Sequence, residues 1–272
     1  MNNKELLNII SEALVESGLA GADALCITAY HGRVVVENAP RQNRPLSART
    51  AERSAEKMYM KIYQPRPGEK RFLSLEEAGG TADPAKYEQV FCGDLDAGTP
   101  EELFLQFNMK CHPLFRGHSL SVGDVVTMDG QSYYCQPVRF QKIDFDEARV
   151  PARDDLLRIV YVEPNRPAFE SMIPNKLNYL QQAVQGPIEV IHLGEGSLLV
   201  CNEEGKFRNL TGCRRIDSSI IAGAFFIVGD AEENFRSLTE QETSRWLERF
   251  AQPEEITQKE VSDDMWFKFY TF

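Results

Sequence analysis

The chain has 272 residues, of which 42% are hydrophobic and 26% are charged, and its formal net charge is −11. This length exceeds that of an ordinary single domain, so two domains are expected, and the apolar content excludes global disorder. Conventional binding of double-stranded DNA is excluded as well, because it requires a basic surface. The acidity favours a role in solubility over a surface that imitates DNA toward a basic partner.

None of the six cysteines stands in a Cys-x-x-Cys pair, and several lie in apolar runs such as Leu199–Cys201. Such residues are typical of free, buried thiols in a reducing compartment. No apolar run approaches the roughly 20 residues that a membrane-spanning helix needs. The opening segment contains Glu12 and Glu16 and lacks the features of a signal peptide. We therefore expect a cytoplasmic protein that has no membrane contact and no cofactor.

Residues 1–50 are predicted to form a helix, a hairpin and a linker. Apolar residues recur at helical spacing from Leu6 to Leu14. Ala24–Val36 is expected to form two strands joined at His31-Gly32, and Asn38–Pro45 has the composition of a linker.

Residues 51–150 are expected to contain more strands than helices. A helix should begin after Thr99, which can cap it, with Pro100 as its first residue and Glu102 as the capping-box partner. Asp129-Gly130 predicts a tight turn between antiparallel strands. The other expected elements are strands at Met58–Tyr63, Tyr87–Cys92, Ser121–Met128 and from Tyr133 to Cys135, and a short helix at Leu75–Ala78.

Residues 151–272 are predicted to form a second mixed module. Ser237-Leu238-Thr239-Glu240 has the pattern of a capping box, and the helix that it opens should end near Phe250. Strands are expected at Leu156–Val162, Ile188–His192, Leu198–Cys201 and Ile220–Val228, and a helix at Ile173–Val184. The sequence therefore predicts an α+β fold of two small mixed α/β modules, 51–150 and 151–272, with largely antiparallel sheets, preceded by a short helix-hairpin segment.

Common catalytic and metal-binding motifs are missing from the sequence. It contains no phosphate-binding Gly-rich loop, no Gly-x-Ser-x-Gly and no His-Glu-x-x-His. Cys111, His112 and His118 come nearest to a metal cluster, but no partner pair stands at a familiar ligand spacing. We therefore expect no metal site.

The stretch Gly117-His118-Ser119 is the first candidate for chemistry. An imidazole titrates near neutrality, so His118 together with Asp124 could supply the general acid or base of a hydrolase or nuclease. The alternative is a loop in which His118 and Ser119 bond to the backbone and lead into the next strand.

The stretch Asn202–Lys206 is the second candidate. Asn202 and Gly205 fit a hairpin with a type I turn and a glycine bulge, whereas Glu203 and Glu204 could form a catalytic carboxylate pair. Lys206 opens a basic group that is suited to an anion such as a nucleotide phosphate. The predicted ligand-binding residues are Asn202, Lys206, Arg208, Arg214, Arg215 and, in the preceding module, Tyr134.

Residues 265–272 are unusually aromatic. A core or edge strand is the simpler interpretation. The alternative is docking onto another subunit, which would give a homo-oligomer, because exposed aromatic side chains are favoured interface anchors.

Two sets of sequence strings resemble known families. The strings that resemble the YodL-like domain are Met58–Tyr63, Phe91–Gly93, Gly117–Val126 and Tyr133–Cys135. The strings that resemble a second, uncharacterised domain, which is found in similar genomes, are Leu156–Pro164, Leu177–Gln182, Val200–Lys206, Ile221–Gly229 and Ser237–Thr239. The chain departs from these patterns twice: Gln136–Phe140 replaces the usual Asp-Ser-x-Gly-Phe, and Cys213-Arg214 replaces an Asn-Arg pair, of which only the arginine is kept.

The resemblance implies an accessory protein of conjugative elements or phages of Firmicutes, where such domains stand beside anti-restriction and other counter-defence modules. It implies no particular reaction. We therefore expect a non-enzymatic counter-defence protein that binds a host defence protein or sequesters a nucleotide signal. The alternatives are a hydrolase or nuclease that uses His118/Asp124 or Glu203/Glu204, and a structural module without a ligand.

Overall fold

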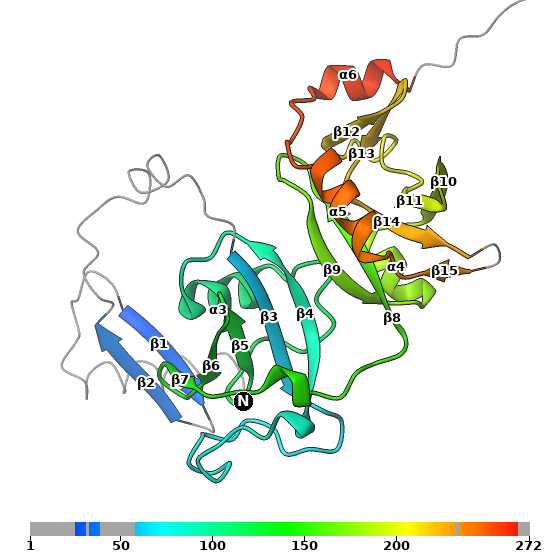
Figure 1. The fold of residues 1–272 in the computed structure, drawn as a ribbon. Coiled ribbons are helices and arrows are strands. Elements are labelled where there is room, and N and C mark those ends of the chain that lie inside the picture. The colour runs from blue at the N-terminus through cyan, green and yellow to red at the C-terminus, as the bar shows by residue number, and fades with distance from the viewer. Residues whose placement is uncertain (1–24, 31–32, 39–57, 232–233, 266–272) are drawn as a thin grey trace, which may run out of the picture.

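The computed structural model describes residues 25–30, 33–38, 58–231 and 234–265 (Figure 1). Near the start, β1 (Leu25–Tyr30) and β2 (Arg33–Asn38) form a two-stranded antiparallel ribbon. The predicted helix that precedes them, the turn at 31–32 and the aromatic residues 266–272 lie outside the described residues.

The first sheet has five antiparallel strands in the order β4-β3-β5-β6-β7. Asp129 and Gly130 join β5 to β6 with φ angles of 49° and 71°, as the predicted tight turn requires. Short 3-10 helices at Pro84–Lys86 and Glu147–Arg149 flank the sheet. The strands are β3 (Met58–Pro65), β4 (Tyr87–Leu95), β5 (Val125–Met128), β6 (Gln131–Cys135) and β7 (Phe140–Ile143).

The helix α3 (Pro100–Met109) packs on this sheet through the buried side chains of Leu103 and Phe107. Thr99 caps it, because the Thr99 hydroxyl accepts a hydrogen bond from the backbone N–H of Glu102 at 3.2 Å. The Glu102 carboxylate accepts from the N–H of Gly98 at 2.7 Å, one residue before the cap. The predicted start of this helix is confirmed.

The second sheet is antiparallel in the order β10-β11-β14-β8-β9, and the short β15 also pairs with β14. Alternate side chains of its strands face opposite cores, so that α4 (Leu177–Val184) packs on one face and α5 (Glu240–Arg249) on the other. The strands are β8 (Leu156–Val162), β9 (Phe169–Pro174), β10 (Ile188–Gly194), β11 (Ser197–Asn202), β14 (Phe225–Asp230) and β15 (Phe235–Arg236).

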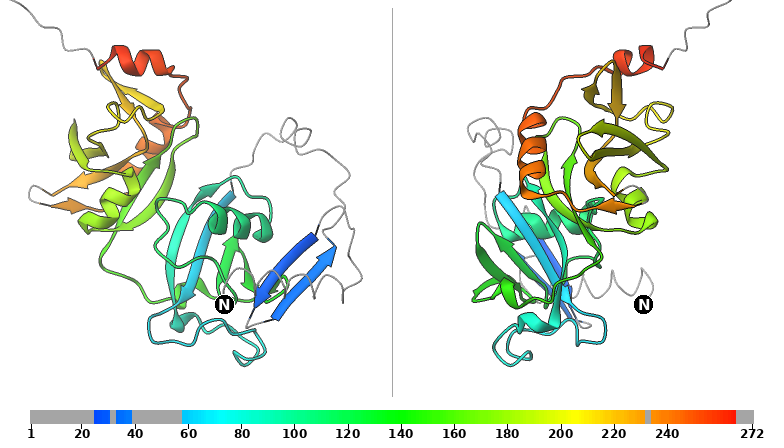
Figure 2. Two further views of the ribbon diagram at one scale, coloured as in Figure 1. Left: turned by 180° about the vertical axis from the view of Figure 1, so that it is seen from behind. Right: turned by 45° about the vertical axis from the view of Figure 1, so that its right-hand side comes forward.

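A separate hairpin of β12 (Gly212–Ile216) and β13 (Ser219–Ala222) extends from this sheet. The last helix, α6 (Gln258–Asp263), covers it with the fully buried Val261, which packs against Ile220 and Ala222. In all views this hairpin and α6 lie at the end of the molecule that is far from the first sheet (Figures 1 and 2).

The two sheets meet where the edge strand β4 of the first lies beside the edge strand β9 of the second. The Ser171 hydroxyl donates a hydrogen bond to the Cys92 carbonyl at 2.6 Å, and a side chain at Gly93 would overlap the ring of Phe169. Arg116 bridges the strands, since its guanidinium donates to the carbonyls of Gln89 and Met172. Residues of both modules therefore share one hydrophobic core.

Several predicted elements differ in the structure because individual residues interrupt them. The strand predicted at Ser121–Met128 begins only at Val125, since Ser121–Asp124 form a turn. The strand predicted at Ile220–Val228 is divided into β13 and β14 by Gly223, whose φ of 87° favours glycine.

The predicted helix boundaries were also wrong at three places. Leu75–Ala78 is a hydrogen-bonded turn and not a helix, and the helix predicted from Ile173 begins at Leu177, because Ile173 belongs to β9. Thr239 and Glu242 form the capping box of α5. The Ser237 hydroxyl, predicted to cap this helix, instead accepts a hydrogen bond from Arg158 N–H. The strands β7, β9, β12 and β15 and the helix α6 were not predicted.

The predicted α+β class with largely antiparallel sheets is confirmed. Within the part of the chain that the structure describes, no helix is both long and apolar enough to cross a membrane. The described cysteines, Cys92, Cys111, Cys135, Cys201 and Cys213, are free thiols, and all except Cys111 are buried.

Candidate functional site

The structure brings His118 and Asp124 together around Gln64, a buried residue of β3. The Gln64 side-chain N–H groups donate to the Asp124 carboxylate at 2.8 Å and to the His118 carbonyl at 2.9 Å, and its oxygen accepts from the His118 N–H at 3.0 Å. The carboxylate also accepts from the N–H of Ser121 at 2.8 Å. A residue from a distant strand therefore fixes the shape of the Gly117–Asp124 loop.

The hydrogen bonds define the tautomer of His118. The Ser119 carbonyl lies 2.8 Å from the His118 Nδ1 and can only accept, so Nδ1 is the donor. In the neutral imidazole Nε2 is then the acceptor nitrogen, and it faces Asp124 Oδ1 at 3.9 Å. These are buried atoms, and neither has a hydrogen-bond partner among the described residues.

Asp124 is fully buried, and burial raises the pKa of its carboxyl to about 8, although the Ser121 and Gln64 hydrogen bonds oppose the rise. Near neutrality the carboxyl therefore carries a proton, and Oδ1 is the oxygen free to hold it, because Oδ2 accepts from Gln64 and Ser121. The 3.9 Å between Oδ1 and the His118 Nε2 exceeds a hydrogen-bond distance, and the His118 side chain is 27% exposed. Among the described residues no hydroxyl hydrogen-bonds to the His118 ring, and the Ser121 hydroxyl donates to the Ser119 carbonyl at 2.7 Å.

Asn202 begins the second predicted site, and its side chain is buried. Its amide donates to the carbonyls of Val184 and Gln185 at 3.1 Å, and its oxygen accepts from the Glu204 N–H at 2.9 Å. Asn202 thus connects the end of α4 to the following turns.

The predicted hairpin at Asn202–Lys206 is wrong, because residues 203–209 form consecutive turns and β11 pairs with β10 and β14. A side chain at Gly205 would overlap the Ala222 carbonyl of β13. Glycine is therefore required at this position for a close approach between backbones, and not for a hairpin bulge.

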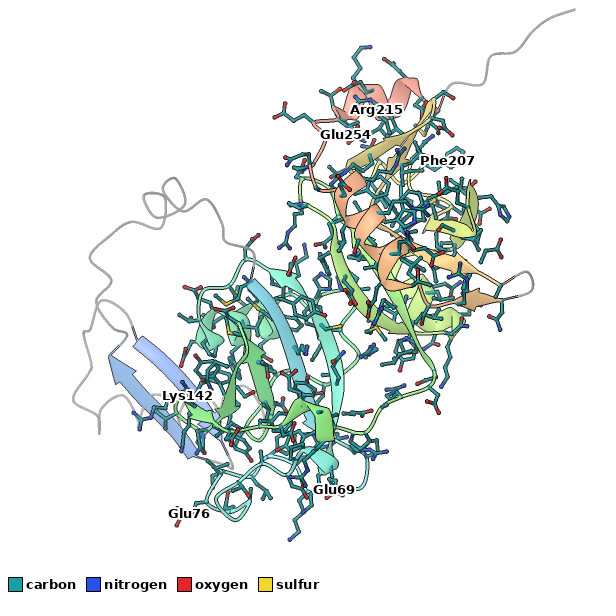
Figure 3. All side chains as sticks on the ribbon, in the orientation of Figure 1. Glu69, Glu76, Lys142, Phe207, Arg215 and Glu254 are labelled. Carbon is teal, nitrogen blue, oxygen red and sulfur yellow. The ribbon has the colours of Figure 1, made fainter. Side chains whose placement is uncertain are left out.

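The four basic residues at 206–215 do not converge. Arg214 is 1% exposed, and its guanidinium donates to the carbonyls of Cys213, Arg166 and Phe250. Arg215, on the adjacent strand position, is exposed and pairs with Glu254 at 2.9 Å and with Glu260 at 2.6 Å (Figure 3). Arg208 is exposed and donates to the Gln185 carbonyl at 2.7 Å.

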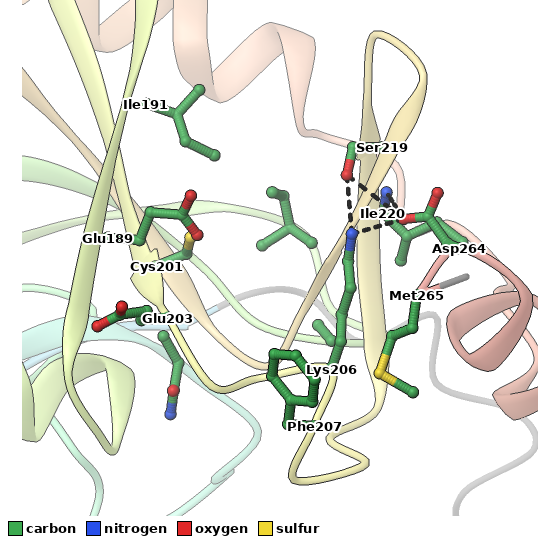
Figure 4. Close-up of a pocket in the computed structure, with 13 residues that line it drawn as sticks. Glu189, Ile191, Cys201, Glu203, Lys206, Phe207, Ser219, Ile220, Asp264 and Met265 are labelled. Atoms are coloured by element: carbon green, nitrogen blue, oxygen red, sulfur yellow. Dashed lines mark hydrogen bonds and ion pairs between the residues drawn. The ribbon is translucent and has the colours of Figure 1, made fainter. Parts of the chain in front are cut away.

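Lys206 extends into a groove of about 380 Å³ between β10 and the β12–β13 hairpin (Figure 4). Its ammonium donates to Asp264 at 2.6 Å and to the Ser219 hydroxyl at 2.8 Å. Although burial opposes it, this contact holds the pKa of Asp264 below its usual value. We call this site the Lys206 groove.

The free charges of the Lys206 groove are negative. Glu189 and Glu203 line it and are exposed, and their carboxylates have no hydrogen bond or ion pair with other described residues. Burial raises the pKa of the neighbouring Cys201 thiol to about 12, and the charge of Glu189 adds to the rise. Since Asp264 neutralises Lys206, the groove is suited to a cation more than to a phosphate.

The rim of the groove is apolar. The ring of Phe207 is 76% exposed and lies beside Lys206 and Met265, opposite Ile191 of β10 (Figure 4). The sequence analysis missed Phe207, Glu189 and Met265 as groove residues. A phenylalanine inside a polar turn was the one signal that pointed to an exposed aromatic ring.

Tyr134 lies in the first module, far from the Lys206 groove along the fold. It is 1% exposed, its hydroxyl donates to the Leu73 carbonyl at 3.0 Å, and it lines a separate hollow of about 670 Å³. The structure therefore does not bring Tyr134 together with the basic residues.

Cys111, His112 and His118 came nearest to a metal cluster in the sequence, but the ring nitrogens of the two histidines face different partners in the structure. The His112 Nδ1 accepts from the Leu114 N–H at 3.1 Å, and its Nε2 lies 3.4 Å from Glu163. Among the described residues, no three His, Cys, Asp or Glu side chains converge as metal ligands do.

Two known families match the chain, one in each of its two modules. Residues 52–145 match the YodL-like domain, and residues 157–251 match a domain of unknown function, DUF3846. No curated protein and no solved structure matches the chain significantly. The two-domain arrangement predicted from the sequence strings is confirmed.

Proposed function

We propose that this chain, a YodL-like domain followed by DUF3846, acts by binding a host defence protein through a basic segment of that protein, as a non-enzymatic counter-defence protein of a mobile element. The observation that carries the proposal is the unpaired acidity of the Lys206 groove, where Glu189 and Glu203 stand beside the exposed Phe207. A lysine or arginine with an adjacent apolar side chain complements this combination.

The proposal favours a protein over a nucleotide signal. Lys206 and Arg215 already pair with carboxylates, and Arg214 is buried against carbonyl groups. Of the four basic residues predicted to bind an anion, Arg208 and Arg214 have no acidic partner among the described residues, and only Arg208 of these two is exposed. A phosphate in the groove would also be repelled by Glu189 and Glu203.

The test is a pull-down from host lysate with tagged full-length chain, followed by mass spectrometry of both proteins and nucleotides. The variant Glu189→Lys/Glu203→Lys reverses the charge of the groove, and Glu204→Lys is the matched control, since Glu204 belongs to the same turns but does not line the groove. We expect one basic protein to be captured by the wild type and the control and lost from the double variant. Recovery of a nucleotide, or equal capture by all three, would contradict the proposal.

A biological readout connects this binding to counter-defence. Expression of the chain in a restriction-proficient host should raise the transformation efficiency of unmodified plasmid. Glu189→Lys/Glu203→Lys should abolish the increase and Glu204→Lys should not.

A second candidate function is hydrolysis at His118, favoured by the 3.9 Å approach of its Nε2 to the protonated Asp124. In this mechanism Oδ1 and Nε2 approach to hydrogen-bond distance, Asp124 donates its proton to Nε2, and the resulting imidazolium protonates the leaving group as water attacks and breaks the scissile bond. Turnover of phosphodiester or ester substrates that is lost in a folded His118→Gln variant would support it. Turnover that persists in this variant, or depends on Glu204 instead, would exclude it.

A further inference from the structure

The edges of the two large sheets are protected to different degrees. The edge strands β4 and β9 lie beside each other at the junction of the modules. The opposite edge of the first sheet, β7, is four residues long and carries the exposed Lys142, and short strands and edge lysines both hinder pairing with another chain. The opposite edge of the second sheet is β10, which lies on the side away from the first sheet (Figure 1).

The strand β10 has none of these protective features. It is seven residues long, contains no proline, lysine or arginine, and pairs regularly with β11 from Ile188 to His192. Among the described residues its backbone is hydrogen-bonded to β11 alone, so the N–H and C=O groups that point outward are free to pair. An exposed edge of this kind can accept an extended segment as a further strand.

Alternate side chains of β10 give this edge a face that belongs to the Lys206 groove. Glu189 and Ile191 line the groove, whereas Val190 between them points to the opposite face of the sheet. Glu203 continues the same wall beyond the start of β10, since its N–H donates to the Pro187 carbonyl at 2.9 Å (Figure 4). The order along this wall is therefore Glu203, Glu189 and Ile191, which is two free carboxylates followed by an apolar side chain.

This order selects the kind of segment that fits the edge. Lys206 does not offset the two carboxylates, because Asp264 pairs with it at 2.6 Å. A strand added to β10 would place alternate side chains roughly 7 Å apart along the groove. Basic residues at two alternate positions would meet the carboxylates, and the next alternate position would bring an apolar side chain beside Ile191.

We propose that the basic segment of the partner adds to β10 as a further strand of the second sheet, with basic side chains at two alternate positions beside Glu203 and Glu189 and an apolar side chain at the next alternate position beside Ile191. This inference rests on the proposed function, since it concerns the same groove and the same basic partner. It adds the conformation and the spacing of the segment: main-chain hydrogen bonds supply affinity, and the groove selects every second residue.

The test uses the full-length chain and a designed peptide, Lys-Thr-Lys-Thr-Val-Thr-Lys-Thr-Lys, which has the proposed order of residues in both chain directions. A peptide of the same composition with its lysines together, Lys-Lys-Lys-Lys-Val-Thr-Thr-Thr-Thr, is the control for charge alone. By fluorescence anisotropy of the labelled peptides, we expect the alternating peptide to bind about tenfold more tightly than the control. Glu189→Lys/Glu203→Lys should abolish its binding and Glu204→Lys should not. Failure of the alternating peptide to bind, or equal binding of both peptides, would overturn the proposal.

Backbone methylation tests the strand pairing itself. Successive N–H groups of an extended segment point to opposite sides, so only every second one can face β10. One form of the alternating peptide is N-methylated at its two inner lysines and another at its two inner threonines, which leaves all side chains unchanged. We expect one form to lose affinity by about tenfold or more and the other to keep it. Equal affinity of the two forms, whether kept or lost, would contradict an added strand.

Hydrogen exchange on the full-length chain locates the pairing. Saturation with the alternating peptide should slow exchange of alternate amides between Ile188 and His192 and leave the amides of β7 unchanged. Exchange that is unaffected in β10 would overturn the proposal, and so would protection of β10 by dimerisation of the chain without peptide.

The same measurements separate this inference from the proposed function. Charge-dependent capture of a basic host protein, together with equal binding of the two methylated forms, would contradict the added strand and leave the proposed function standing. Unequal binding of the methylated forms without capture of any host protein would support the added strand and contradict the proposed function alone.

Discussion

Residues 117–124 and residues 202–215 are both polar stretches beside buried strands, but their side chains are partnered differently. In the first stretch His118 and Asp124 converge on Gln64 and leave two buried atoms without partners. In the second stretch Lys206, Arg214 and Arg215 point to separate partners and contribute to three different contacts. The comparison teaches that polar residues close in sequence converge on one point only where a side chain from another element gathers them, as Gln64 gathers His118 and Asp124.

The adjacent residues Arg214 and Arg215 give the largest expected contrast in stability. Arg214→Ala removes a buried guanidinium and leaves the carbonyls of Arg166 and Phe250 without this donor. We expect a loss of about 3–5 kcal/mol in the free energy of unfolding. Arg215→Ala should leave it nearly unchanged, because the Arg215 ion pairs are solvent-exposed. Urea unfolding of both variants measures the difference, and equal losses would break the comparison.

Asp124 gives the next largest effect, through the pH dependence of stability. Its pKa is raised to about 8 in the folded chain, whereas an unfolded aspartate titrates near 3.9. Between about pH 4 and 8 the folded state therefore keeps a proton that the unfolded state releases, and stability falls as pH rises, by at most about 1.4 kcal/mol for each pH unit.

The variant Asp124→Asn should remove this dependence and remain folded. Its amide oxygen can accept from Gln64 and Ser121, while its N–H₂ group takes the place of the carboxyl proton that faces His118. Urea midpoints at pH 5 and pH 8 give the test: the wild type should lose roughly 2–4 kcal/mol between them, and Asp124→Asn much less. A wild type that gains stability over this range would show that Asp124 is ionised in the fold.

Local patterns predicted much of the fold. The Asp129-Gly130 turn and the Thr99 cap are decided by residues close in sequence, and so is the strand Leu156–Val162, whose predicted and observed bounds agree. The contacts of the candidate site could not be predicted in the same way. Nothing near His118 in the sequence indicates that Gln64, 54 positions earlier, joins it to Asp124. Likewise, the basic pattern at 206–215 gave no sign that Asp264 and Glu254 would neutralise it.

Gly117 tests whether Gln64 holds the first stretch together. A side chain at this position would overlap the Gln64 amide, which is 2% exposed and cannot move without breaking its hydrogen bonds to His118 and Asp124. We expect Gly117→Ala to lower the free energy of unfolding by about 1–3 kcal/mol. Ser119→Ala is the matched control, because the network uses the carbonyl of Ser119 and its side chain is exposed. A tolerated Gly117→Ala would mean that the loop holds its shape without Gln64.

Lys206 gives the smallest expected effect and tests the second stretch. Its contact with Asp264 is partly exposed, so Lys206→Gln should lower the free energy of unfolding by no more than about 1 kcal/mol at pH 7. Because the pKa of Asp264 lies below its usual value in the fold, this stabilisation is present near neutrality and is lost as the pH falls through the folded pKa. The wild type and Lys206→Gln should therefore converge in stability near pH 3, whereas Lys259→Gln, at the exposed Lys259–Asp263 pair, should match the wild type at both pH values. A Lys206→Gln deficit that is equally large in acid would show that the lysine acts through its packing in the groove and not through its charge.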